Sequence, residues 1–224
     1  MIIYAYTMTD DTGFAPAVKD GTLSLACCKT YLRYKVANDI KAGEHEVYII
    51  GLCGKELANY HSYCRYYFPI YIAKITEVVN TKEYFSNIKY FDRADSQYRL
   101  INETWYFTKD NPHHEATTNE YLHPLKNPEN DEDLYYTRKR VSELNYVLLS
   151  TEYACFGDFY ANDNSPNVPS FLKKIGDARS KAWRGGLDPI TVLDSGEQQK
   201  LAEFVSDNKE KFKTQKTIDA SFIK

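Results

Sequence analysis

Short runs of apolar residues predict strands at four places in the chain. Residues 2–9 alternate isoleucine and tyrosine with smaller residues, and residues 46–50, 67–78 and 146–150 are rich in isoleucine, tyrosine, valine and leucine. β-Branched and aromatic side chains in short runs are typical of strands, because they pack well on a pleated surface. The segment 153–158, which follows the last of these strands, is predicted to be a loop.

Helical signals are confined to shorter segments. Thr81 is predicted to cap a helix over residues 81–85, with Tyr84 and Phe85 on its buried side. Two more helices are predicted beyond Pro169. Residues 195–198 resemble a capping box, and the apolar residues that follow share one helical face: Leu201, Phe204, Val205 and Phe212.

Two stretches carry no clear period. Residues 22–35 fit either a short helix or an extended segment, and residues 92–130 are polar, aromatic and rich in turn formers. Because strands do not alternate regularly with helices, the pattern predicts the α+β class and argues against a doubly wound sheet. We expect a mixed, partly closed β-sheet or barrel with peripheral helices.

The composition supports a β-rich structure, and the charge balance argues against one class of nucleic-acid binder. The 20 Tyr, 11 Phe and 2 Trp make 15% of the chain aromatic. Tyrosine favours half-buried strands and offers both a ring and a hydroxyl for binding. The 28 Lys and Arg against 31 Asp and Glu give a net charge of −3. This balance argues against a uniformly basic nucleic-acid binder and leaves room for a local basic patch.

The sequence predicts a cytoplasmic protein without a membrane partner. Its longest apolar stretch, Phe68 to Ala73, is far shorter than the roughly 20 residues that span a bilayer. The N-terminus has neither the basic start nor the small-residue cleavage site of a signal peptide. The five cysteines are irregularly spaced, without a CxxC pair, which is typical of a reducing environment.

The common catalytic motifs are absent. The chain has no GxxxxGK[ST], GxGxxG, GxSxG or HExxH motif, which weakens NTPase, dinucleotide-enzyme, serine-hydrolase and zinc-protease interpretations. Candidate chemistry must therefore come from less common clusters.

A turn over residues 10–16 and the segment 25–29 form the first candidate cluster. Phe14 could stack on a base, while Lys29 and Arg33 hold a phosphate. Cys28 lies beside Lys29, a setting that lowers a thiol pKa and favours a thiolate nucleophile. The alternative is a capped turn followed by two small buried cysteines, since free cysteine is among the most buried residue types.

The second cluster is aromatic and rich in histidine. Trp105 precedes His113 and His114, one of which could act as an acid or base near neutral pH. Neighbours on an extended chain point to opposite faces, so the two cannot act together. Their spacing to His123 matches no standard zinc arrangement, and no metal site is predicted. The alternative is an ordinary loop pair bonded to the backbone.

A third cluster is basic. Within residues 173–184 one acidic residue, Asp177, accompanies Lys173, Lys174, Arg179, Lys181 and Arg184, with Trp183 among them. Such a segment could meet phosphates while the indole stacks on an unpaired base. The alternative is a solvated helix face.

Several short motifs, in this order along the chain, resemble one known family. They are residues 6–16, 22–29 with Arg33, 48–51, 71–77, 84–85, 95–98, Trp105, 111–114, 147–150 and 153–157. Together they resemble the nucleotide modification associated domain 2 family, and the pair Asp-Thr-Gly-Phe-Ala-Pro and Ala-Cys-Cys-Lys is the most specific part. The resemblance predicts a domain over residues 1–186 and a C-terminal helical extension over residues 187–224.

The resemblance implies a protein that handles a nucleotide or modified base, because the family is associated with DNA base modification in phages and bacteria. It also implies, more loosely, a likeness to the small PUA and EVE β-barrels, whose pockets hold a modified base. The family's motifs add Asp11 to the candidate catalytic residues, and Trp105 joins Phe14 as a stacking ring. Further candidate ligand-binding residues are Thr12, Tyr98, Tyr153 and Phe156.

Three classes of function stay open at this point. The first is a nucleotide- or base-handling domain, enzymatic or not, with DNA as a further candidate partner. The net charge favours a free nucleotide, because duplex binding depends on several Lys and Arg contacts. The second is a non-catalytic reader of a modified base or small nucleotide. The third is a protein-binding inhibitor, for which tyrosines are common interface anchors. The sequence indicates neither a cofactor nor an oligomeric state.

Overall fold

The computed structural model describes ten stretches of the chain: residues 1–8, 16–26, 29–43, 45–96, 98–102, 104–108, 122–124, 146–161, 167–181 and 188–209. For residues 104–108 and 122–124 it describes the backbone. The chain divides into two compact units. The first unit comprises Met1–Asp11, Asp39–Thr76 and Ser150–Lys216, and the second comprises Thr12–Asn38, Glu77–Leu149 and Thr217–Lys224. The predicted boundary after residue 186 lies outside the described residues and stays a prediction.

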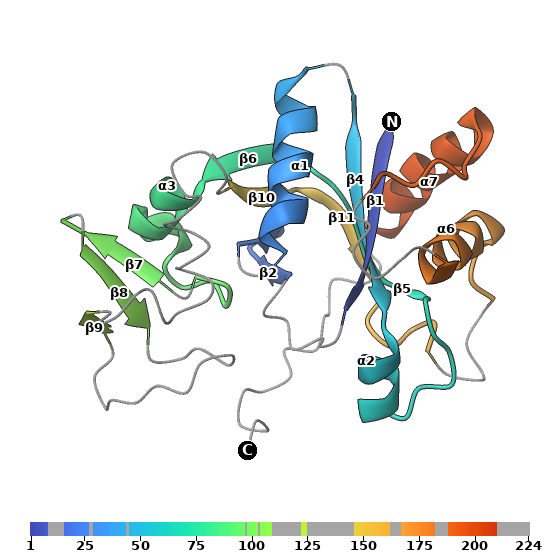
Figure 1. Ribbon diagram of the computed structural model, residues 1–224, viewed down its shortest axis with the longest axis horizontal. Coiled ribbons are helices and arrows are strands. Elements are labelled where there is room, and N and C mark those ends of the chain that lie inside the picture. Colours follow the sequence, from blue (N-terminus) through green and yellow to red (C-terminus); the bar gives the residue numbers. More distant parts are fainter. Residues whose placement is uncertain are drawn as a thin grey trace. The chain divides into compact units, whose positions relative to one another are not determined.

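The first unit contains a mixed four-stranded sheet with the order β1-β4-β5-β11 (Figure 1). Its strands are β1 (Ile2–Met8), β4 (Val47–Cys53), β5 (Pro69–Lys74) and β11 (Glu152–Cys155). β1 and β4 are parallel, whereas β5 is antiparallel to both β4 and β11. Every residue of β4 is buried, as expected for a central strand covered on both faces.

Three helices belong to the first unit: α2 (Lys55–Tyr60), α6 (Ser170–Lys181) and α7 (Ser195–Asn208). The rings of Phe171 on α6 and Phe204 on α7 pack edge to face, with centroids 5.7 Å apart. The two helices predicted beyond Pro169 are therefore confirmed. The capping box of α7 begins at Asp194, one residue before the predicted position, and its partner is Glu197.

The second unit contains a four-stranded sheet with the order β2-β3-β10-β6 and a three-stranded sheet with the order β7-β8-β9. The first of these is formed by β2 (Ala17–Lys19), β3 (Thr22–Leu25), β10 (Tyr146–Ser150) and β6 (Glu77–Asn80). The second is formed by β7 (Tyr98–Ile101), β8 (Thr104–Thr108) and β9 (Leu122–Pro124).

Helices α1 (Thr30–Lys41) and α3 (Thr81–Ser86) follow β3 and β6, and a short 3-10 helix, η1, spans Ile88–Tyr90. Tyr84 and Phe85 lie in the hydrophobic core of the second unit, as predicted. The core also contains Ala26, Val79, Tyr90, Tyr98, Val147 and Leu149.

Several sequence predictions need correction. Residues 67–78 form two strands, β5 and β6, which pair in different sheets. The predicted loop 153–158 begins within a strand, β11. The cap of α3 is Asn80, whose side chain accepts a hydrogen bond from the backbone N–H of Lys82 at 2.8 Å. The poorly periodic stretch 92–130 contains β7, β8 and β9.

The α+β class is confirmed, since helices and mixed sheets coexist without regular alternation. Among the described strands no closed barrel forms, so the predicted barrel stays a prediction. Within the described part of the chain, no helix has the length and apolar character needed to cross a membrane.

Candidate functional site

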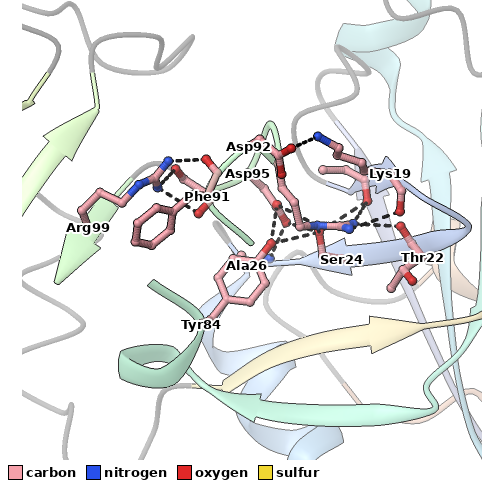
Figure 2. Close-up of polar contacts among 12 residues, drawn as sticks. Lys19, Thr22, Ser24, Ala26, Tyr84, Phe91, Asp92, Asp95 and Arg99 are labelled. Atoms are coloured by element: carbon pink, nitrogen blue, oxygen red, sulfur yellow. Dashed lines mark hydrogen bonds and ion pairs between the residues drawn. The ribbon is translucent and has the colours of Figure 1, made fainter. Parts of the chain in front are cut away.

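A buried carboxylate, Asp95, lies at the centre of a polar cluster in the second unit. Its side chain is fully buried. One carboxylate oxygen accepts hydrogen bonds from the Ser24 hydroxyl at 2.7 Å and the Ala26 backbone N–H at 3.1 Å. The other accepts from the Tyr84 hydroxyl at 2.8 Å. Figure 2 shows these three partners around Asp95, two from the β3 segment and one from α3.

Arg93 ties the same cluster to the β2–β3 hairpin. Its Nε donates to the Ser24 hydroxyl at 3.0 Å and lies 3.9 Å from a carboxylate oxygen of Asp95. Its two terminal nitrogens donate to backbone carbonyls of both strands, Ala17 at 3.1 Å, Lys19 at 3.3 Å and Thr22 at 2.8 Å. Guanidinium carries five donors in a fixed plane, so one side chain can fasten both strands.

Burial sets the protonation of this cluster. It raises the pKa of the Asp95 carboxyl, while Arg93 and the hydrogen bonds from Ser24, Tyr84 and Ala26 lower that pKa by a smaller amount. Burial and the neighbouring Asp95 charge raise the pKa of the Tyr84 hydroxyl far above 10.0. Tyr84 therefore stays protonated and acts as a donor to the carboxylate.

Two further cations secure the turn that carries Asp95. Lys19 forms an ion pair with Asp92. The buried Arg99 donates to the carbonyls of Ser96 at 2.7 Å and of Phe91, and its guanidinium carbon lies 4.2 Å from the centroid of the Phe91 ring. Figure 2 shows both contacts on either side of the Asp95 turn. The turn is thus fixed independently of any ligand.

The cluster holds one end of the β2–β3 hairpin. Because Ala17 pairs with Ser24 in antiparallel register, β2 begins where β3 ends. The sequence segments that continue from this end are residues 9–15, which precede Pro16, and residues 27–28, which follow Ala26. These are the two motifs that carry the most specific family resemblance, and Asp95 belongs to a third.

Lys29 and Arg33 are the described members of the first predicted cluster. Lys29 is exposed, has a left-handed backbone with φ 50°, and accepts the first helical hydrogen bond of α1 from the Arg33 N–H at 3.0 Å. The Arg33 side chain is buried and donates to the carbonyl of Tyr146 at 2.5 Å. Lys29 is therefore at the surface, whereas Arg33 is engaged in fastening α1 to β10.

The described aromatic candidates are packed in the two units. Tyr98 is buried against Phe85, with ring centroids 5.3 Å apart. Tyr153 and Phe156 are buried in the first unit, where Phe156 contacts Phe204 at 5.7 Å between centroids. A ligand-binding role for these three rings stays a prediction, and in the structure all three pack within the protein.

The remaining predicted residues lie outside the described residues. They are Asp11, Thr12, Phe14, Cys28, His113 and His114. The backbone of Trp105 lies in β8 and pairs with Leu100 of β7. The structure describes the backbone of Trp105 and not its side chain. Within the described stretches no group of His, Cys, Asp and Glu could hold a metal ion.

The interactions of Ser24, Tyr84, Arg93 and Asp95 were missed by sequence reasoning. Ser24, Tyr84 and Asp95 lie within motifs that carry the family resemblance. Membership of these motifs was the signal in the sequence that could have identified them. Arg93 lies outside those motifs, and no local pattern marks it.

Comparison with known proteins gives one finding. The family model described as nucleotide modification associated domain 2 matches residues 1–213, nearly the whole chain. No curated protein and no solved structure matches. This match covers far more than half of the chain and therefore establishes the family. The chain belongs to the nucleotide modification associated domain 2 family.

Proposed function

We propose that the protein binds a nucleotide or modified base in the second unit, at the end of the β2–β3 hairpin, and acts in nucleic-acid modification or phage–host conflict in the cytoplasm. The observation that carries this proposal is the Asp95 cluster, which fastens the hairpin end from which the two most specific motifs continue. A preorganised support of this kind is what a binding site built from loops requires.

Chain length supports the identity of the binding groups. Phe14 is two residues from Pro16, and Cys28 is two residues from Ala26. Two residues of chain span at most about 7 Å, and the proposal assigns both residues to the site at the hairpin end. Lys29 is exposed directly before α1, whose first backbone N–H groups favour anions. We therefore propose that the base stacks on Phe14 and that the phosphate binds at Lys29.

The test is equilibrium titration with a panel of ordinary and modified nucleotides. Lys29→Gln should weaken nucleotide binding about tenfold, because it removes one charge-assisted contact. Lys82→Gln on α3 is the matched control, an exposed lysine of the same unit that should leave affinity unchanged. Equal affinities in wild type and Lys29→Gln would contradict the proposal.

A non-catalytic reader is the second candidate. It is favoured by the cluster itself, since Asp95 and Tyr84 are buried and bonded to each other and offer no acid or base to a ligand. His113→Ala separates the two candidates. An enzyme should lose turnover more than affinity, whereas a reader should lose affinity alone.

A further inference from the structure

A cavity in the first unit shares no lining residue with the proposed hairpin site. It has a volume of about 480 Å³, within the range of small-molecule sites. One wall is the segment Arg65–Phe68, which leads into β5, and the opposite wall comes from α6. The lining residues are Arg65, Tyr66, Tyr67, Phe68, Asn167, Val168, Lys173, Gly176 and Asp177.

The walls of the cavity are fixed against each other. The N–H of Tyr67 donates to the Cys53 carbonyl, and the N–H of Cys53 donates to the Phe68 carbonyl, both at 2.9 Å. A Cβ added at Gly176 would lie 2.6 Å from the Tyr67 carbonyl oxygen, so α6 packs against this segment at a distance that excludes a side chain at this position. Tyr67 also holds a left-handed backbone with φ 56°, a conformation that persists in tyrosine only where the surroundings impose it. The cavity is therefore formed before any ligand binds.

The two cations that line the cavity outnumber its carboxylates. Within the described part of the chain, neither Arg65 nor Lys173 forms an ion pair or a side-chain hydrogen bond, although the neighbouring Lys174 pairs with Glu197 at 2.5 Å. Asp177 is the one carboxylate among the described lining residues. Two cations against one anion leave the cavity positive by one charge in a chain whose net charge is −3.

The cavity also offers a flat ring and an amide. Tyr66 is 48% exposed, while Phe68 and Val168 are buried. Exposed aromatic rings beside cations bind compounds that join a planar ring to an anion, because stacking and charge act together. The Asn167 amide and Asp177 carboxylate add polar partners for exocyclic or sugar groups.

We propose that this cavity is a second binding site, and that its ligand is a nucleoside 5′-monophosphate. The base stacks on Tyr66, and the phosphate lies between Arg65 and Lys173. From the basic segment 173–184 the site uses Lys173, Gly176 and Asp177. It shares no residue with the hairpin site, so either proposal can fail alone.

The test is photo-crosslinking with 5-iodo-2′-deoxyuridine 5′-monophosphate, with the modified peptides identified by mass spectrometry. The proposal predicts an adduct on the peptide that contains Tyr66. Lys173→Gln and Arg65→Gln should each reduce that adduct about tenfold, as expected for losing one charge-assisted contact. Lys200→Gln, an exposed lysine on α7 that does not line the cavity, is the matched control and should leave the yield unchanged.

Competition defines the ligand. Thymidine 5′-monophosphate should suppress the adduct, whereas equal concentrations of thymidine or inorganic phosphate should suppress it at least tenfold less effectively. The proposal is overturned if phosphate competes as well as the nucleotide, or if Lys173→Gln and Lys200→Gln give equal yields. Adducts confined to residues 12–38 or 77–149 would also overturn it, while supporting the hairpin site.

Discussion

The hydrogen bond from Tyr84 to Asp95 gives the most direct test of the buried cluster. Tyr84→Phe removes the hydroxyl that lies 2.8 Å from the carboxylate and leaves the ring, which stacks on Tyr90 at 4.4 Å between centroids. Asp95 keeps its bonds from Ser24 and Ala26. Because volume is nearly conserved, the loss is that of a hydrogen bond to a buried carboxylate and of a longer one to the Ser24 hydroxyl at 3.3 Å, together about 2–3 kcal/mol.

The assay is urea unfolding monitored by tyrosine fluorescence and circular dichroism. With a denaturant slope of about 2 kcal/mol per molar urea, the midpoint should fall by roughly 1–1.5 M. Tyr160→Phe is the matched control, since Tyr160 is buried and its raised pKa has burial as its cause, without a charged partner. Its midpoint should stay within about 0.3 M of wild type.

The pH dependence of stability tests whether the buried Tyr84 hydroxyl causes the difference between wild type and Tyr84→Phe. The native pKa of Tyr84 lies above the unfolded value of 10.0, so the native state holds the proton more tightly. Above pH 10 the wild type should therefore lose stability relative to Tyr84→Phe, by up to about 1.4 kcal/mol per pH unit. The reasoning is refuted if Tyr84→Phe costs no more than Tyr160→Phe at pH 7, or if its deficit widens above pH 10.

Two further variants test the cluster and the first sheet. The native pKa of Asp95 lies above 3.8, so wild type loses stability as pH rises from below 3.8. The urea midpoint of wild type should therefore exceed that of Asp95→Asn by less and less as pH rises. A difference that grows with pH would contradict the account. A Cβ at Gly51 would lie 2.2 Å from the Tyr71 ring, so Gly51→Ala should cost about 3 kcal/mol in thermal unfolding. Gly21→Ala, with φ 70° and open space, should cost about 1 kcal/mol, and equal losses would count against the predicted overpacking.

The sequence was informative where structure depends on local pattern. Short runs of apolar, β-branched and aromatic residues located β1, β4 and β10, and the capping residues and helical spacing located α7. The other helix expected beyond Pro169 is α6. The cap positions were displaced by one residue because Asn80 and Thr81, like Asp194 and Ser195, are adjacent residues of capping types. Side-chain identity alone does not choose between such neighbours.

Features that depend on distant partners were not predictable from one sequence. The segment 67–78 was correctly expected to be extended, but its division follows from pairing of β5 with β4 and of β6 with β10. The Asp95 cluster joins residues 69 and 71 positions apart in the chain. The hydrogen bond from the Arg33 side chain to the Tyr146 carbonyl, 113 positions away, was not foreseen, and the phosphate-binding role of Arg33 stays a prediction. Periodicity carries no information on these pairings.

The central claim is that the hairpin end binds a nucleotide, and native mass spectrometry tests it most directly. Wild type and Lys29→Gln would be compared as purified and after addition of ordinary and modified nucleotides. The account predicts a saturable nucleotide adduct on the wild type, and about tenfold more nucleotide to reach the same occupancy of the hairpin site in Lys29→Gln. Equal occupancy of the two proteins, or no adduct on either across the whole panel, would contradict it.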